Sequence, residues 1–275
     1  MTSDVILAVD DHAGVLEVYR KIFAAEQAKE FDVLGLAENE GSWPPLECRT
    51  YDSPKKLIED VRRDALRGVH YPLCIVDVLM PEQNGVMTIR QLREIDPEIE
   101  IIICTADPGT VPLGVQGELG ERIFFVRKPP VTDEFVLMVH TLVGYWRDRQ
   151  ELRRKTAFFT SLLESMSDLI FMKDVRGIYL TCNATFARFA KRASSEIIGA
   201  TDRDFLPPEL CRDFLQQDML VMETGRPSTY ELQVEHPDGG TCLLETVKSP
   251  VYSAAGECIG LIGVGRDITS REKAG

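Results

Sequence analysis

The stretch LCIVDVLMP at residues 73–81 decides the fold of the first half of this chain. It is apolar on both faces, as a strand buried in a parallel sheet should be, and its single acid, Asp77, stands where the first apolar run ends. Similar runs alternate with helical periodicity on either side of it, which predicts a doubly wound α/β domain with five parallel strands and helices on both faces. We expect strands at 4–10, 31–37, 73–81, 99–106 and 122–128, and helices at 12–28, 53–67, 85–95, 111–119 and from 132 onward.

Length and composition indicate a folded protein of two domains. The chain has 275 residues, and domains average roughly 150. The net charge of −13 argues against a surface that binds nucleic acid. No apolar run approaches the roughly 20 residues that span a bilayer, and the start lacks the basic region of a signal peptide, so we expect a cytoplasmic protein that does not enter a membrane. The seven cysteines contain no C-x-x-C motif, which favours reduced thiols, with Cys74 and Cys104 packed in the core.

The helical pattern that begins near Thr132 continues far beyond the last expected strand. Seven of nine positions in strict three-four spacing are apolar, which is typical of a coiled coil and predicts a homodimer. The alternative is a single amphipathic helix that packs on its own domain. The nine positions are Phe135, Met138, Leu142, Tyr145, Arg149, Leu152, Thr156, Phe159 and Leu163.

The chain changes character after Asp168 and becomes α+β. Turn signals at residues 237–240 and 254–256 join neighbouring apolar runs, which predicts an antiparallel sheet. We expect strands at 169–174, 178–182, 229–235, 241–252 and 258–269, with helices at 183–191 and 209–224.

Polar residues end the strands of the first half, where ligands of open α/β sheets bind. Converging carboxylates repel one another unless a divalent cation neutralises them, and oxygen ligands suit Mg²⁺. A lysine and a threonine nearby would supply donors to a phosphoryl group, with Asp77 as its acceptor. The strand-end residues are Asp10, Asp11, Asp77, Thr105 and Lys128.

These residues, together with Pro81 and Gly85 in VDVLMPEQNG and with Phe125 and Pro129, resemble the receiver domain of two-component response regulators over about residues 1–130. The resemblance implies that Asp77 accepts phosphate from a histidine kinase or phosphotransfer protein. It also implies that Asp11, Asp77 and the Leu79 carbonyl bind Mg²⁺, with Asp10 acting through water. Lys128 would pair with the phosphoryl oxygens, Thr105 would move toward them, and Phe125 would follow as the switch aromatic. The Lys128–Pro129 peptide bond is typically cis in this family, and His12 and the Pro- and Gly-rich segment after Thr105 depart from its pattern.

Residues from about 156 to 271 resemble a PAS domain. Three segments carry the resemblance: LIFMKDVRGIYLTCNATFARF, EIIGATDRDFLPPE and the closing GVGRDITSREK. Such domains are five-stranded antiparallel sheets with helices over one face, and many bind a small ligand between the two. The lone histidine of this half, His236, is poorly placed as a haem ligand. The segment CRDFLQ, which begins at Cys211, is out of register with the flavin motif, so we expect neither haem nor flavin.

Together these features predict a phosphorelay protein without a catalytic output domain: a receiver at 1–130, a helical linker at 131–164 and a PAS-like domain at 165–271. One alternative is the N-terminal regulatory fragment of a hybrid histidine kinase or diguanylate cyclase. Another is an aspartyl-phosphate hydrolase, although Leu79 stands where such enzymes need a second Asp. A nucleotide-binding domain is disfavoured because the first strand is followed by acids instead of glycines.

Overall fold

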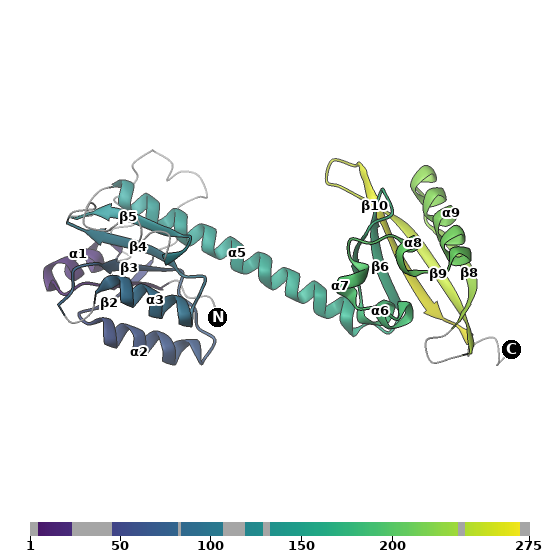
Figure 1. Ribbon diagram of the computed structural model, residues 1–275. Coiled ribbons are helices and arrows are strands. Elements are labelled where there is room, and N and C mark those ends of the chain that lie inside the picture. The colour runs from purple at the N-terminus through teal and green to yellow at the C-terminus, as the bar shows by residue number, and fades with distance from the viewer. Residues whose placement is uncertain are drawn as a thin grey trace. The chain divides into compact units, whose positions relative to one another are not determined.

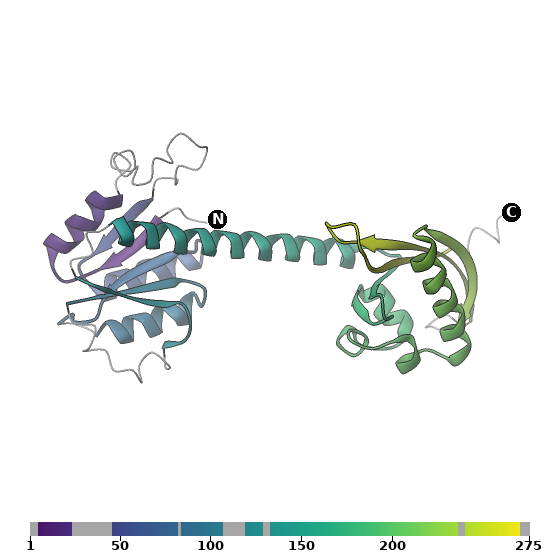
Figure 2. The ribbon, with the colours of Figure 1, turned by 90° about the horizontal axis from the view of Figure 1, so that it is seen from above.

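The computed structural model describes residues 5–23, 46–81, 84–106, 119–128, 133–235 and 240–269. The chain divides into two compact units, Met1–Arg154 and Lys155–Gly275. Figures 1 and 2 show the elements of both units from two sides.

The first unit contains a five-stranded parallel sheet with the strand order β2-β1-β3-β4-β5. This confirms the predicted doubly wound architecture. β3 and β4 are buried along their whole length, in keeping with their continuous apolar sequences. The strands are β1 (Val5–Val9), β2 (Glu47–Tyr51), β3 (Leu73–Asp77), β4 (Glu100–Thr105) and β5 (Ile123–Arg127).

The strand beside β1 was not predicted. β2 has the sequence ECRTY, is mostly half-exposed, and therefore carries no apolar run that would mark it. The expected strand at 31–37 lies outside the described residues, as do Pro129 and nearly all of the expected helix at 111–119.

Helices cover both faces of this sheet (Figure 1). Side chains of α1 and α5 share one apolar core, and side chains of α2 and α3 share the other. Cys74 and Cys104 are fully buried in these two cores, as predicted. The helices are α1 (Ala13–Phe23), α2 (Pro54–Ala65), α3 (Gly85–Ile95) and α5 (Asp133–Ser165).

The long helix α5 is continuous over 33 residues, but its predicted seam does not form one uncovered stripe. Phe135 and Leu142 are buried in the core that α5 shares with α1 and the sheet. In its first half, therefore, α5 packs on its own domain, and the expectation of a free seam from Phe135 onward is wrong there. The same apolar spacing serves a helix on a sheet and a helix in a coiled coil, so the sequence pattern could not separate the two.

The second unit contains a five-stranded antiparallel sheet with the order β7-β6-β10-β9-β8. Short helices and α9 lie over one face of it (Figure 2), and the predicted turn at 254–256 joins β9 to β10. Among the described residues, no helix is long and apolar enough to cross a bilayer. The elements are β6 (Leu169–Asp174), β7 (Tyr179–Cys182), α6 (Ala184–Ala190), α7 (Ser194–Ile197), α8 (Asp202–Phe205), α9 (Pro208–Thr224), β8 (Ser228–Glu235), β9 (Thr241–Tyr252) and β10 (Cys258–Asp267).

Candidate functional site

Four of the expected site residues meet at the carboxyl edge of the parallel sheet. Asp10 follows β1, Asp77 ends β3, Thr105 ends β4 and Lys128 follows β5. These four strands are adjacent in the sheet and are paired in parallel, so their ends come to the same edge. The backbone N–H of Lys128 donates to the carbonyl of Thr105 at 2.9 Å, which fixes where the lysine side chain starts.

The Lys128 ammonium lies between two carboxylates. Its Nζ is 2.6 Å from Asp10 Oδ2 and 3.0 Å from Asp77 Oδ2. Asp10 and Asp77 are both almost fully buried. The two acids therefore share one cation, and the site keeps a net negative charge when both are ionised.

Burial and ion pairing have opposite effects on the pKa values of Asp77 and Lys128. Burial raises the pKa of Asp77, while the hydrogen bond from Lys128 and a backbone hydrogen bond from Leu79 oppose that rise. For Lys128, burial alone would lower the pKa, but hydrogen bonds to Asp10 and Asp77 outweigh it and raise the pKa. The lysine is therefore held firmly in its charged form.

Asp11 and His12 extend the acidic cluster toward solvent. The His12 ring nitrogen Nδ1 is 2.9 Å from Asp11 Oδ1, and the His12 backbone N–H donates to Asp10 Oδ1 at 2.9 Å. One ligand atom from each of Asp10, Asp11 and His12 lies within 4.8 Å of the others, close enough to hold a metal ion. The carboxylates suit Mg²⁺, while an imidazole is a ligand that transition metals favour.

The net charge of the side chains at this edge of the sheet also favours a divalent cation. Asp10, Asp11 and Asp77 with the Lys128 ammonium leave a formal charge of two negative units when all are ionised. A bound Mg²⁺ would neutralise it. Leu79, whose carbonyl was expected as a ligand, lies two residues beyond Asp77 and is exposed.

The loop from β3 to α3 explains why VDVLMPEQNG needs its glycine. The Asn84 side chain accepts a hydrogen bond from the Val86 N–H and caps α3, and the Gly85 N–H donates to the Val78 carbonyl at 3.1 Å. A Cβ atom at residue 85 would lie 2.2 Å from the Asp77 carbonyl oxygen. Only glycine allows the helix to begin this close to Asp77.

Thr105 and Phe125 lie on the adjacent strands β4 and β5. Thr105 is fully buried at the end of β4. Phe125 is half-buried in β5 and packs against the core on the side of α2 and α3. Phe125 pairs in register with Ile103, two residues before Thr105.

A second cluster of charged residues lies inside the second unit and was not predicted. Two lysines on strands and two aspartates on helices form ion pairs there, all with little or no exposure. Period-two counting from the inward-facing Leu169 and Phe171 also places Lys173 inward, and this signal could have revealed it. The four residues are Lys173, Asp202, Asp218 and Lys248.

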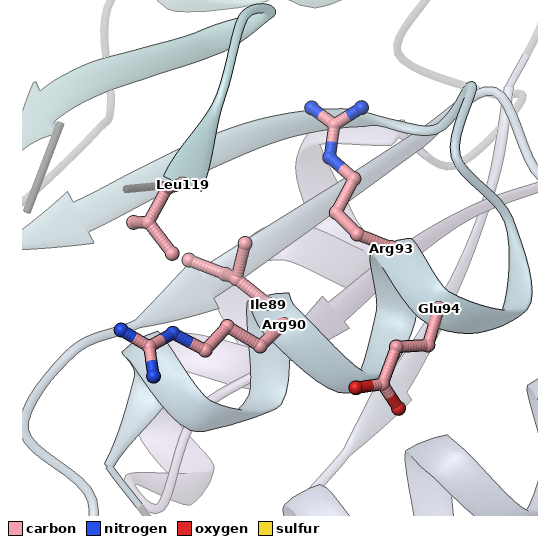
Figure 3. Close-up of a pocket in the computed structure, with 5 residues that line it drawn as sticks. All are labelled: Ile89, Arg90, Arg93, Glu94 and Leu119. Carbon is pink, nitrogen blue, oxygen red and sulfur yellow. The ribbon is translucent and has the colours of Figure 1, made fainter. Parts of the chain in front are cut away.

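The first unit also has a shallow groove of about 310 Å³ on α3 (Figure 3). The Leu119 side chain points toward Ile89, while the Arg93 guanidinium donates to the carbonyls of Pro97, Glu121 and Arg122. Arg93 therefore ties α3 to the start of β5. None of the residues that line this groove belongs to the strand-end site.

A family model for the PAS fold matches residues 163–273. With the antiparallel sheet and its helical cover, this match shows that the second unit contains a PAS domain, as predicted. The PAS domain of BvgS from Bordetella pertussis is a similar solved structure, with 23% identity and a TM-score of 0.38. The alignment covers 44% of this chain and 91% of that one.

Two curated relatives belong to signalling systems. The aerobic respiration control sensor protein ArcB of Escherichia coli (strain K12) is 28% identical over 120 residues, which are 44% of this chain and 15% of ArcB. A diguanylate cyclase of Vibrio cholerae serotype O1 is 32% identical over 110 residues, 39% of this chain and 34% of the cyclase. The chain thus spans a minor part of either relative. Its PAS domain is homologous to sensor domains of histidine kinases and diguanylate cyclases, which is consistent with signal transduction.

Proposed function

We propose that this chain is a phosphorelay protein whose first unit is a receiver domain, with Asp77 as the phosphoryl acceptor. The observation that carries the proposal is the Lys128 ammonium held between Asp10 and Asp77 at the strand ends. Phosphoryl transfer depends mainly on positioning and charge neutralisation, and this edge of the sheet offers both. The donor is the phosphohistidine of a histidine kinase or a phosphotransfer protein.

In this reaction an Asp77 carboxylate oxygen forms a bond to phosphorus while the P–N bond of the donor breaks, and the electron pair stays with the donor imidazole. Lys128 then exchanges its contact with Asp77 for one with a phosphoryl oxygen. The Thr105 hydroxyl donates to another phosphoryl oxygen, and Phe125 moves toward the space that Thr105 leaves.

The metal would be Mg²⁺. Asp11, Asp77 and the Leu79 carbonyl would hold it directly, and Asp10 would do so through water. When bound, it supplies positive charge to the phosphoryl oxygens. The chain's own residues orient the acceptor: the backbone of β3 and the capped start of α3 fix Asp77 at the edge of the sheet.

The signal would reach the PAS domain through α5 in a homodimer. Beyond residue 151, α5 exposes large apolar side chains, among them Leu152, Phe158 and Phe159, each more than 60% exposed. Apolar side chains on a helix favour a partner helix.

The PAS domain would bind neither haem nor flavin, because its interior holds buried ion pairs. An absorption spectrum of the purified protein tests this expectation.

An alternative is that the chain is the regulatory part of a larger hybrid histidine kinase or diguanylate cyclase. It is favoured by the short share of ArcB and of the Vibrio cyclase that the alignments cover. An aspartyl-phosphate hydrolase is the weaker alternative, because Leu79 cannot act as the general acid that such an enzyme needs two residues beyond its nucleophile.

Incubation with acetyl phosphate and Mg²⁺, followed by intact-mass spectrometry, tests the proposal. We expect one added phosphoryl group on the wild type and none on Asp77→Asn. Asp11→Asn should label more slowly, and chelation of Mg²⁺ should abolish labelling. Asp52→Asn is the matched control, since Asp52 is an exposed acid paired with Lys56 in the same unit, and it should label like the wild type. Retained labelling of Asp77→Asn would refute the proposal, and continuous phosphate release with many turnovers would instead favour the hydrolase.

A further inference from the structure

The interior of the PAS domain contains donors on the sheet and acceptors on the helices. The donors are Lys173 on β6, Tyr179 on β7 and Lys248 on β9, and none of the three has exposed surface. The acceptors are the carboxylates of Asp202, which begins α8, and Asp218 in α9. The helices therefore bring two carboxylates to two ammonium groups and one hydroxyl group on the sheet.

Each carboxylate oxygen in this cluster accepts a hydrogen bond. Asp202 Oδ2 accepts from Lys173 Nζ at 2.5 Å, and Asp202 Oδ1 accepts from the Tyr179 hydroxyl at 2.6 Å. Asp218 Oδ2 accepts from Lys173 Nζ at 2.8 Å, and Asp218 Oδ1 accepts from Lys248 Nζ. Lys248 Nζ also donates to the Phe214 carbonyl at 3.1 Å. Two ammonium groups and two carboxylates thus balance in charge, and each of the four carboxylate oxygens has a donor.

Aromatic rings complete the enclosure of the two lysines. Lys173 Nζ lies 4.8 Å from the ring centre of Tyr179, and Lys248 Nζ lies 4.7 Å from that of Phe214. Such contacts favour a cation at these positions but supply no negative charge. A buried ammonium without an anion is strongly unfavourable, so the donors require carboxylates beside them.

We propose that the sheet of this PAS domain is a carboxylate-binding site that the chain fills with its own Asp202 and Asp218. In the wild type the internal carboxylates hold α8 and α9 on the sheet and exclude a free carboxylate. Asp202 is the replaceable ligand: it lies at the end of the cluster, is 7% exposed, and sits on a helix of four residues. A separate groove of about 360 Å³ at the junction of α8 and α9 has Arg203 and Arg212 in its lining.

The test is a chemical rescue of Asp202→Ala in the full chain. This change removes one carboxylate and leaves a space of about that size beside Lys173 and Tyr179. Formate is the probe, because it consists of little more than a carboxylate. We expect saturable formate binding to Asp202→Ala by calorimetric titration, together with a formate-dependent rise in the melting temperature. The wild type should bind no formate at concentrations that saturate the variant.

Three controls test whether formate binds specifically to the buried cluster. Asp202→Asn fills the same volume without charge and should not bind formate. Asp204→Ala, on the same helix, removes an exposed carboxylate that accepts from Thr201, and it should behave like the wild type. Lys173→Met added to Asp202→Ala should abolish the formate binding.

Several outcomes would overturn the inference. Equal formate binding by the wild type would show that the internal carboxylates do not fill the site. Rescue by chloride at equal ionic strength would show that the cluster does not select carboxylates. An Asp202→Ala protein that binds no formate, or that stays unfolded at every formate concentration, would contradict the inference directly, and one that folds only with formate would support it.

Discussion

Gly85 stands where a side chain would collide with the backbone of the proposed phosphoacceptor. A Cβ atom there would lie 2.2 Å from the Asp77 carbonyl oxygen and 2.9 Å from the Val78 Cα. Backbone atoms cannot rotate out of the way as a flexible side chain can. We therefore expect Gly85→Ala to destabilise the first unit by about 1–3 kcal/mol and to slow labelling of Asp77 by acetyl phosphate.

Gly144 offers the matched control for this change. It lies in α5, and a Cβ atom added there would meet nothing within 4 Å. Gly144→Ala should stabilise the protein by about 0.5–1 kcal/mol, because alanine favours a helix. Urea unfolding measures both variants, and a Gly85→Ala protein as stable as the wild type would show that α3 can move away from Asp77 without cost.

His140 in α5 gives stability a dependence on pH. Burial, with a smaller effect from the Arg147 charge, lowers the pKa of His140 from its ordinary 6.5 to about 4. Between these two pH values the unfolded chain binds a proton at His140 more readily than the folded chain does. The contribution of His140 therefore lowers the free energy of unfolding as the pH drops from 6.5 toward 4, and it is constant above pH 6.5. Because His140 is only partly buried, solvent screening reduces the effect to about 1–2 kcal/mol.

The variant His140→Gln isolates this contribution. The stability difference between wild type and variant, measured by urea unfolding at several pH values, should change between pH 6.5 and 4 and stay constant above that window. A constant difference at all pH values would show that His140 titrates normally in the folded protein.

At the scale of the element, α5 has two environments along one helix. Its first half packs Phe135, Val139 and Leu142 into the core. Where it leaves the sheet, Arg149 pairs with the buried Glu100 at the start of β4, and Arg153 Nη2 is 3.0 Å from Glu98 Oε1. These contacts fix the first part of the helix to its own domain.

A charge at Leu142 should therefore unfold the first unit instead of acting only on association. Leu142→Glu would bury an unpaired carboxylate, and we expect it to cost about 3–5 kcal/mol. Tyr145→Glu is the control, since Tyr145 is 58% exposed on the same helix and should tolerate the change. Circular dichroism during urea unfolding compares them, and equal stability of the two variants would contradict the packing of Leu142.

Sequence alone predicted the buried central strands and the residues at their ends. β3 and β4 are apolar because both of their faces are buried, and Asp10, Asp77 and Lys128 could be placed because parallel strands end at one edge. β2 was missed because an exposed edge strand needs no apolar run. The buried lysines were missed because charge in an interior is decided by partners far away in sequence, such as Asp218 for Lys248.

At the scale of the whole molecule, we propose that the second half of α5 forms the contact between two chains. Phe158, Phe159 and Leu162 are exposed there by 61%, 62% and 40%. Exposed aromatic side chains on a helix lose unfavourable contact with water when a second helix covers them. We expect the wild type to be a dimer at tens of micromolar, which corresponds to roughly 7 kcal/mol of association or more.

Phe159→Glu tests this association without touching the first unit's core. A carboxylate at a coiled-coil contact would lose its hydration on pairing, so the variant should be a monomer in analytical ultracentrifugation while Asp77 labels as in the wild type. Ser161→Glu supplies the control, because Ser161 is exposed outside the predicted seam and should leave the dimer intact. A wild type that sediments as a monomer with and without phosphorylation would end the coiled-coil mechanism. A Phe159→Glu dimer would instead place the interface on another surface, and labelling of Asp77 would remain a separate question because the acidic edge lies at the ends of β1, β3 and β5.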